Sequence, residues 1–147
     1  MKKTLLILVL FCFSSLSLYA KTLTALCDEP IGYALIDFMG KTDKGEDNIS
    51  GSKPKIVWDM ETTNATVIVQ HTTAIGGGIN SMEGFVFMPS DEQVTIITSL
   101  EGQGMAMYSI FLNLDILIST EHKNGLMGMP GGAVGKMYRS NCKININ

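Results

Sequence analysis

The stretch that decides the fold is GFVFMPSDEQVTIITSL, residues 84–100. Two runs rich in Val, Ile, Thr and Phe, at residues 84–88 and 93–100, flank the tetrapeptide Pro89-Ser90-Asp91-Glu92. Branched and aromatic side chains suit a pleated strand, whereas Pro, Ser and Asp favour a tight turn. The stretch therefore predicts a β-hairpin. Its second run alternates apolar and polar residues, and Ile97 is the exception.

Similar short runs fill the rest of the chain. Further strands are expected at residues 22–27, 32–38, 55–60, 65–71, 104–111, 116–122 and 136–144. Ile56, Trp58 and Met60 alternate with Lys55 and Asp59, as in a strand with one buried face. After the first twenty residues, no window of twelve has a clear 3.6-residue apolar period, so the sequence predicts an all-β protein.

The spacing of these runs predicts their connectivity. Eight or nine strands with short connections favour an antiparallel up-and-down meander, because parallel neighbours need longer crossovers. A meander of this size hides its edges by closing into a barrel or folding into a sandwich. We expect a small closed barrel, with a β-sandwich as the alternative. Longer loops are expected at residues 40–54, 72–82 and 124–135.

The first twenty residues predict a secretory signal peptide. Lys2 and Lys3 precede an apolar stretch at residues 4–13, and a serine-rich segment then leads to Ala20, where cleavage is expected. The apolar stretch is shorter than the roughly twenty residues that a spanning helix needs, and no later segment is a membrane-spanning candidate. The Met-Lys-Lys start is typical of bacterial export. The sequence thus predicts a periplasmic or secreted protein whose single β domain covers residues 21–147.

Charge and composition narrow the class of partner. The chain has 147 residues, with 11 basic and 14 acidic side chains and a formal net charge of −3. Without residues 1–20, 9 basic residues stand against 14 acidic ones, a net charge of −5. This balance argues against a nucleic-acid partner. The negative net charge would steer the chain toward a basic partner. The apolar fraction of 46% excludes a disordered chain.

The cysteines predict one disulfide bond. Cys12 lies in the expected signal peptide, which leaves Cys27 and Cys142 in an oxidising compartment. A metal pair would need further ligands, and none stands near either cysteine. A bridge would bring the first and last strands within about 7 Å at Cα. That is the contact which closure of a barrel requires.

Residues that carry chemistry are sparse. The two histidines are His71 and His122, and neither forms a Ser-His-Asp or Cys-His pattern with its surroundings. We therefore expect no catalytic residues, no cofactor and no enzymatic activity. Both histidines are expected at strand ends, at least partly exposed.

Methionine is the unusual residue of this composition. Met105-Ala106-Met107 and Met127-Gly128-Met129 are Met-x-Met pairs, and His122 lies between them. Thioethers are soft ligands that suit Cu(I). The alternative is packing, in which Met105 and Met107 fill a gap in the core and the other pair plugs a barrel mouth.

The expected layout, a signal followed by a disulfide-tied meander of about eight strands, resembles that of lipocalin-type barrels. Arg139 lies on the last expected strand, where lipocalins often place an arginine near a tryptophan. The opening Gly-x-Trp motif of that family is absent, and Trp58 lies in the third expected strand. The resemblance is architectural, and no family membership is inferred from it.

Three functions are compatible with these features. The leading hypothesis is a non-catalytic protein that binds an apolar or amphipathic small molecule inside the barrel, because the strands are apolar and the loops are rich in glycine. The alternative is a protein-interaction module, such as an inhibitor or immunity protein. The second alternative is Cu(I) binding in the periplasm. A cavity through the barrel would favour the first, a filled core with an exposed apolar patch the second, and convergent methionine sulfurs the third.

Overall fold

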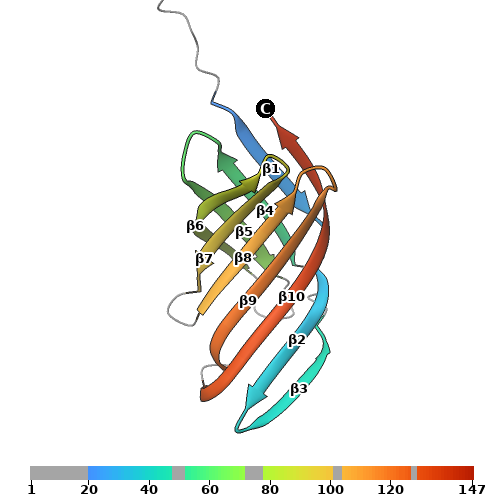
Figure 1. The fold of residues 1–147 in the computed structure, drawn as a ribbon, viewed down its shortest axis with the longest axis vertical. Helices are drawn as coiled ribbons and strands as arrows, with labels where there is room; N and C mark the ends of the chain where they lie inside the picture. The colour runs from blue at the N-terminus through green and yellow to red at the C-terminus, as the bar shows by residue number, and fades with distance from the viewer. Residues whose placement is uncertain (1–19, 48–51, 72–77, 101–103, 127–128) are drawn as a thin grey trace, which may run out of the picture.

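The computed structural model describes residues 20–47, 52–71, 78–100, 104–126 and 129–147 (Figure 1). These residues form strands and turns, and they contain no helix that could cross a membrane. The expected signal peptide lies almost wholly outside them and stays a prediction. The strands are β1 (Thr22–Cys27), β2 (Ile31–Phe38), β3 (Lys41–Glu46), β4 (Lys53–Asp59), β5 (Asn64–His71), β6 (Gly78–Ser90), β7 (Gln93–Ser99), β8 (Gly104–Phe111), β9 (Ile116–Leu126) and β10 (Met129–Ile146).

The strands form one antiparallel meander that closes into a barrel. β1, β4 and β5 to β10 are the eight barrel strands, and the pairing of β1 with β10 closes the ring (Figure 1). The predicted all-β barrel is confirmed. β1 and β2 lie end to end along the same edge of β10, because β1 pairs with residues 142–146 and β2 with residues 132–139. β4 and β3 likewise lie end to end, because β4 pairs with β1 and β3 pairs with β2.

A sheet therefore projects beyond the barrel. It consists of β2, β3 and the parts of β9 and β10 beside them, residues 118–126 and 129–139, and we call it the projecting sheet (Figure 1). It is continuous with the barrel wall, because residues 118–123 of β9 also pair with β8. Two sequence expectations fail here. Residues 40–54 were expected as a loop but contain β3, and residues 124–135 lie largely in β9 and β10. Pairing with neighbouring strands outweighs the low strand propensity of a charged segment and of a glycine-rich one.

The interior of the barrel is filled by side chains. Trp58 is 4% exposed, and its indole Nε1 donates a 2.9 Å hydrogen bond to the carbonyl of Thr62. Arg139 is exposed, and its side chain alternates with buried Tyr138 and Ser140, so it points away from Trp58 and the core. The largest fully buried side chains are those of Leu23, Ile56, Val67, Val94, Ile96, Thr98, Ile110 and Leu117.

The predicted disulfide is confirmed. Cys27 and Cys142 are direct register partners on β1 and β10, with a Cα–Cα distance of 4.0 Å. The bridge joins positions 115 residues apart in sequence and fastens the seam that closes the barrel. A disulfide in this position fits an oxidising, exported location.

Candidate interaction face

Exposed apolar side chains form a row across neighbouring strands. The pairing registers of β2, β10, β9, β8, β7 and β6 align, in that order, Tyr33, Met137, Thr120, Met107, Ile97 and Phe85. Cross-strand partners project from the same face of a sheet. The next row, which includes Tyr138, Tyr108 and Ile96, is buried in the core. The row that begins at Tyr33 therefore lies on the outside.

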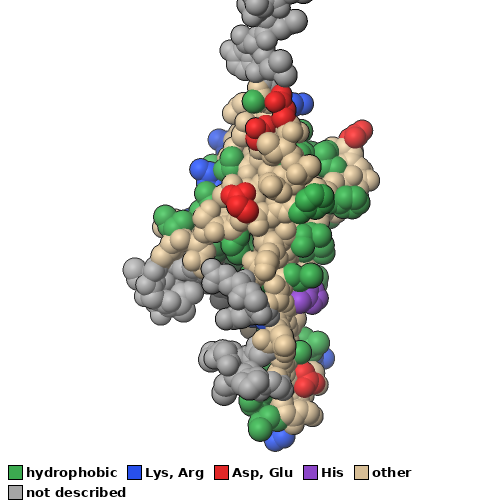
Figure 2. Space-filling view, turned by 90° about the vertical axis from the view of Figure 1, so that its left-hand side faces the viewer, with side chains coloured by type: hydrophobic (Ala, Val, Ile, Leu, Met, Phe, Trp, Pro, Cys, Tyr) green, Lys and Arg blue, Asp and Glu red, His purple; other side chains and the backbone are tan. Residues whose placement is uncertain are grey.

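Two parallel rows widen this surface. On one side the registers align Leu35, Gly135, His122 and Met105. The row on the other side is mixed, and it runs through Ile31, exposed Arg139, Ile118, Ser109, Thr95 and Phe87. Hydrophobic side chains gather along the right-hand edge of the space-filling view, with a histidine among them (Figure 2). We define the outer apolar face by nine side chains that are 38–70% exposed: Ile31, Tyr33, Leu35, Phe85, Phe87, Ile97, Met105, Met107 and Met137.

The outer apolar face is larger than chance exposure explains. A large apolar side chain presents about 150–250 Å² when fully exposed, so nine half-exposed ones present on the order of several hundred Å². Monomeric proteins rarely expose more than a few hundred Å² of contiguous apolar surface without a function. The opposite side is more polar, because the outer positions of β1 and β4 include Thr22, Thr24, Lys53, Lys55 and Asp59, with Leu26 as the exposed apolar exception. The apolar surface is thus concentrated on one side.

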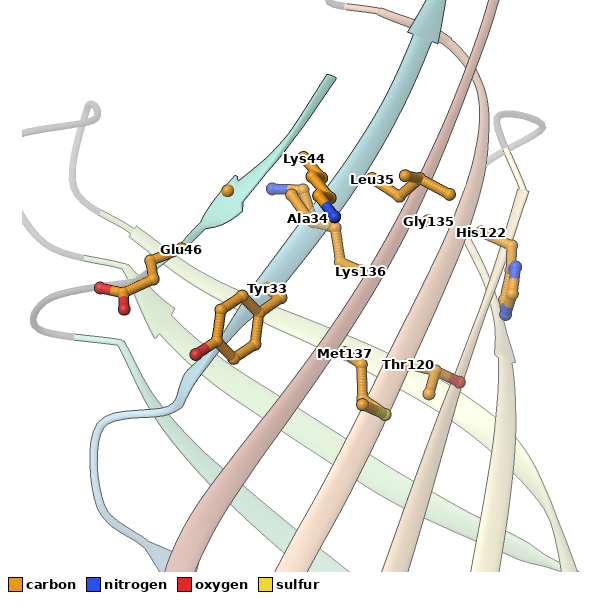
Figure 3. A pocket seen from close by; sticks show the side chains of 11 residues that line it. Tyr33, Ala34, Leu35, Lys44, Glu46, Thr120, His122, Gly135, Lys136 and Met137 are labelled. Atoms are coloured by element: carbon orange, nitrogen blue, oxygen red, sulfur yellow. The ribbon is translucent and has the colours of Figure 1, made fainter. Parts of the chain in front are cut away.

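A groove of about 810 Å³ lies at the projecting end of this face. Tyr33 and Leu35 of β2 stand on one side of it, and Thr120 and His122 of β9 stand on the other (Figure 3). Gly135 of β10 lies between Leu35 and His122 in the register, and a Cβ at this position would meet no atom within 4 Å. The absence of a side chain at Gly135 keeps the groove open.

One polar atom in this face has no partner. The Thr120 hydroxyl is shielded from water, and none of the described residues forms a hydrogen bond with it. Its register partners are Met107 on β8 and Met137 on β10. A buried hydroxyl without a partner carries an energetic penalty, and a partner's polar group would relieve that penalty.

Charged side chains lie at the β3 edge of the groove, where Lys44 and Glu46 are the register partners of Leu35 and Tyr33, and on the inner side of the projecting sheet. A second hollow of about 550 Å³ has acidic and basic side chains in its lining. Asp47 accepts hydrogen bonds of 2.6 Å from Lys136 Nζ and 2.8 Å from the Tyr138 hydroxyl, and Lys123 pairs with Glu121 at 2.9 Å. These charges are satisfied by one another, which indicates a structural role.

The ionisation of Asp47 reflects these contacts. Partial burial alone would raise the pKa of Asp47, but hydrogen bonds from Lys136 and Tyr138, with the positive charges of Lys136 and Lys123, hold the pKa below its ordinary value. Burial raises the pKa of the Tyr138 hydroxyl, and its hydrogen bond to Asp47 raises it further. Asp47 is therefore a carboxylate that ties the end of β3 to β10.

The structure places the predicted metal candidates that it describes on one surface, the outer apolar face. Met105 and Met107 are 53% and 38% exposed on the outer apolar face, so they do not fill a gap in the core. His122 is exposed within β9, not at its end, and lies directly opposite Met105. Met127 lies outside the described residues, as do the side chains of Met129 and His71.

Sequence reasoning missed the outer apolar face, although one signal was present. Phe85, Val86 and Phe87 are consecutive apolar residues, as are Ile96 and Ile97. Consecutive apolar residues in a strand put apolar groups on both faces. Ile97, the exception to the alternation, is 41% exposed, whereas Ile96 is fully buried.

No cluster of three or more His, Cys, Asp or Glu side chains suited to a metal ion occurs in the described part of the chain. Comparisons of the chain with protein-family models, with curated proteins and with solved structures give no match.

Proposed function

We propose that the chain is an exported, non-catalytic protein-interaction module that docks on a partner protein through its outer apolar face. The observation that carries this proposal is the one-sided concentration of nine exposed apolar side chains. The barrel interior is occupied by the chain's own side chains, which favours binding outside the barrel over a small molecule inside it. The likeness to lipocalins is then one of barrel architecture alone.

The composition of the face supports a protein partner. Aromatic residues and methionine are enriched at protein interfaces, and flexible methionines adapt to the shape of a partner. The face offers Tyr33, Phe85 and Phe87 beside three methionines. The groove over Gly135, at the projecting end of the face, would receive a protruding side chain of the partner, as an anchor pocket does in other interfaces.

The charge of the chain specifies the partner further. The chain carries a net charge of −3, which becomes −5 without residues 1–20. Complementary charge accelerates association and suppresses wrong partners. The partner is therefore a protein with an apolar surface and a net basic charge. The predicted signal peptide and the disulfide support an encounter in the periplasm or outside the cell.

Site-specific photo-crosslinking in the producing cells tests the proposal. A photoreactive residue is placed at Ile97, at the centre of the face, or at Lys55 on the polar side as the matched control. The expected result is an adduct of one discrete mass from position 97, with a basic protein as its second component, and none from position 55. Equal adducts from both positions, or none from either, would overturn the proposal.

A further inference from the structure

The outer apolar face contains a cluster of soft ligands around one histidine. Met105 on β8 and His122 on β9 are direct register partners, so their Cβ atoms lie about 4.5–5.5 Å apart. This spacing lets a thioether sulfur and an imidazole nitrogen reach one ion between them. The sequence places these two residues 17 positions apart, and the antiparallel register brings them together.

Two further methionines flank the same histidine. Met107 and Met137 both pair with Thr120, which is two residues from His122 on the same face of β9. Each therefore occupies a diagonal position relative to His122, at about 7–8 Å, within reach of a long side chain. Methionine has three rotatable bonds, which allow its sulfur to swing toward a shared ion.

The surroundings of His122 leave this cluster of soft ligands accessible to a metal ion. Gly135, on the other side of His122, contributes no side chain, so the imidazole faces the groove. Glu121 and Lys123, the sequence neighbours of His122, project from the opposite face and pair with each other at 2.9 Å. The cluster thus offers thioethers and an imidazole, and the charges of Glu121 and Lys123 point away from it. On its own face, Arg139 lies two residues from Met137 on β10, and Lys44 and Glu46 line the groove from β3.

We propose that His122, Met105 and one of Met107 and Met137 bind Cu(I) on the outer apolar face. Soft thioether ligands select Cu(I), and imidazole suits copper as well. Hard cations prefer oxygen ligands, and the four side chains supply none. The site shares its methionines with the docking face, but the two functions can be tested separately, because replacing methionine by leucine removes a ligand and leaves the face apolar.

Metal titration of the purified, disulfide-bonded chain tests this site. Ag(I) serves as a redox-inert soft cation, and Cu(I) is titrated without oxygen against a chromophoric chelator. Binding of one ion should shift the NMR signals of the Met105 methyl group, of the His122 ring and of one of the other two methionines. Met105→Leu and His122→Gln should each weaken binding about tenfold or more. Loss of a residue that only contacts a metal ligand already weakens binding by about this much, and these two residues are ligands themselves.

Met88→Leu is the matched control, because Met88 is 41% exposed on β6, three strands away from β9. Its affinity for both cations should equal that of the unaltered chain. The site would be overturned if no saturable binding occurs, if Met105→Leu leaves the affinity unchanged, or if Met88→Leu weakens binding equally. Circular dichroism of each variant verifies that the barrel is intact.

Discussion

Asp47, the residue that follows β3, accepts a hydrogen bond of 2.8 Å from the hydroxyl of Tyr138 on β10. The same carboxylate oxygen accepts a bond from Lys136, and the Asp47 amide donates to the Gly32 carbonyl at 2.9 Å. One residue thus fastens both β2 and β10 to the end of β3. Since β2 carries Tyr33 and Leu35, this contact on the inner side holds part of the outer apolar face in place.

Replacement of this carboxylate should loosen the projecting sheet. Asp47→Asn removes the charge that pairs with Lys136, and we expect it to lower the free energy of unfolding by about 1 kcal/mol, a value reduced for partial exposure. Urea unfolding measures the difference. Asp91→Asn, on an exposed turn, is the control and should leave the free energy unchanged. An equal effect of the two variants would contradict this role for Asp47.

The contribution of Asp47 should depend on pH in a defined direction. Because its pKa is lower in the folded chain than the ordinary value of 3.8, its stabilisation is complete above that value. It is lost as the pH falls through the lower, folded-state pKa. The stability gap between the unaltered chain and Asp47→Asn should therefore be constant from about pH 7 to pH 5 and shrink below about pH 4. Urea midpoints across this range measure the gap, and a gap that widens on acidification would refute the assignment.

The disulfide should dominate the resistance of the barrel to unfolding. Its two cysteines are 115 residues apart, and for a loop of this length the chain-entropy model gives about 4–5 kcal/mol. Replacing both Cys27 and Cys142 by serine should lower the free energy of unfolding by a few kcal/mol. The reduced, unaltered chain is the internal control and should unfold at the same denaturant concentration as the double variant. A double variant as stable as the oxidised chain would contradict the prediction.

Two isoleucines that are neighbours in sequence allow a buried position to be compared with an exposed one. Ile96 is fully buried, whereas Ile97 is 41% exposed on the outer apolar face. Ile96→Ala should cost about 2–5 kcal/mol through lost burial and a cavity. Ile97→Ala should cost less than about 1 kcal/mol, because no cavity forms at a surface position. Thermal unfolding compares the two, and comparable losses would place Ile97 in the core.

Filling the groove should weaken docking without lowering the stability of the fold. A side chain at Gly135 meets open space, and a glycine within a strand interior is itself unfavourable. Gly135→Val should therefore leave the melting temperature unchanged or raise it slightly, while the photo-crosslink from position 97 weakens. Gly78→Val is the control, since this exposed glycine at the start of β6 also faces open space and is not among the residues that line the groove. If Gly135→Val leaves the crosslink intact, the groove is not part of the docking surface.

The barrel could be predicted from sequence because its determinants are local. Three signals were visible: the alternation around Ile56 and Trp58, the turn at Pro89-Ser90-Asp91-Glu92, and the two terminal cysteines. The first two depend only on neighbours in sequence, and the third depends on a covalent bond. β3 could not be predicted in this way. Its six residues, KTDKGE, are all exposed, and they become a strand only by pairing with β2. The glycine-rich start of β10 is likewise held by β2 and by β9.

The candidate site depends on registers that no local pattern contains. The Met-x-Met pair at Met105 and Met107 was visible in the sequence, but its position outside the barrel was not. The proximity of Met105 to His122 arises from the register of β8 and β9, and that of Met137 from the register of β9 and β10. Shifting either register by one residue would move these side chains to the other face.

Hydroxyl-radical labelling shows whether a partner covers the outer apolar face in the producing cells. The labelling of Tyr33, Phe85 and Phe87 is compared between the purified chain and the same chain in the exported fraction of the producing cells. Leu114, which is 59% exposed on the β8–β9 turn, and Met39, which is 82% exposed after β2, are the controls. The three aromatic residues should be protected in the exported fraction, while both controls should react equally in the two samples. Equal labelling of all five residues in both samples would contradict this prediction.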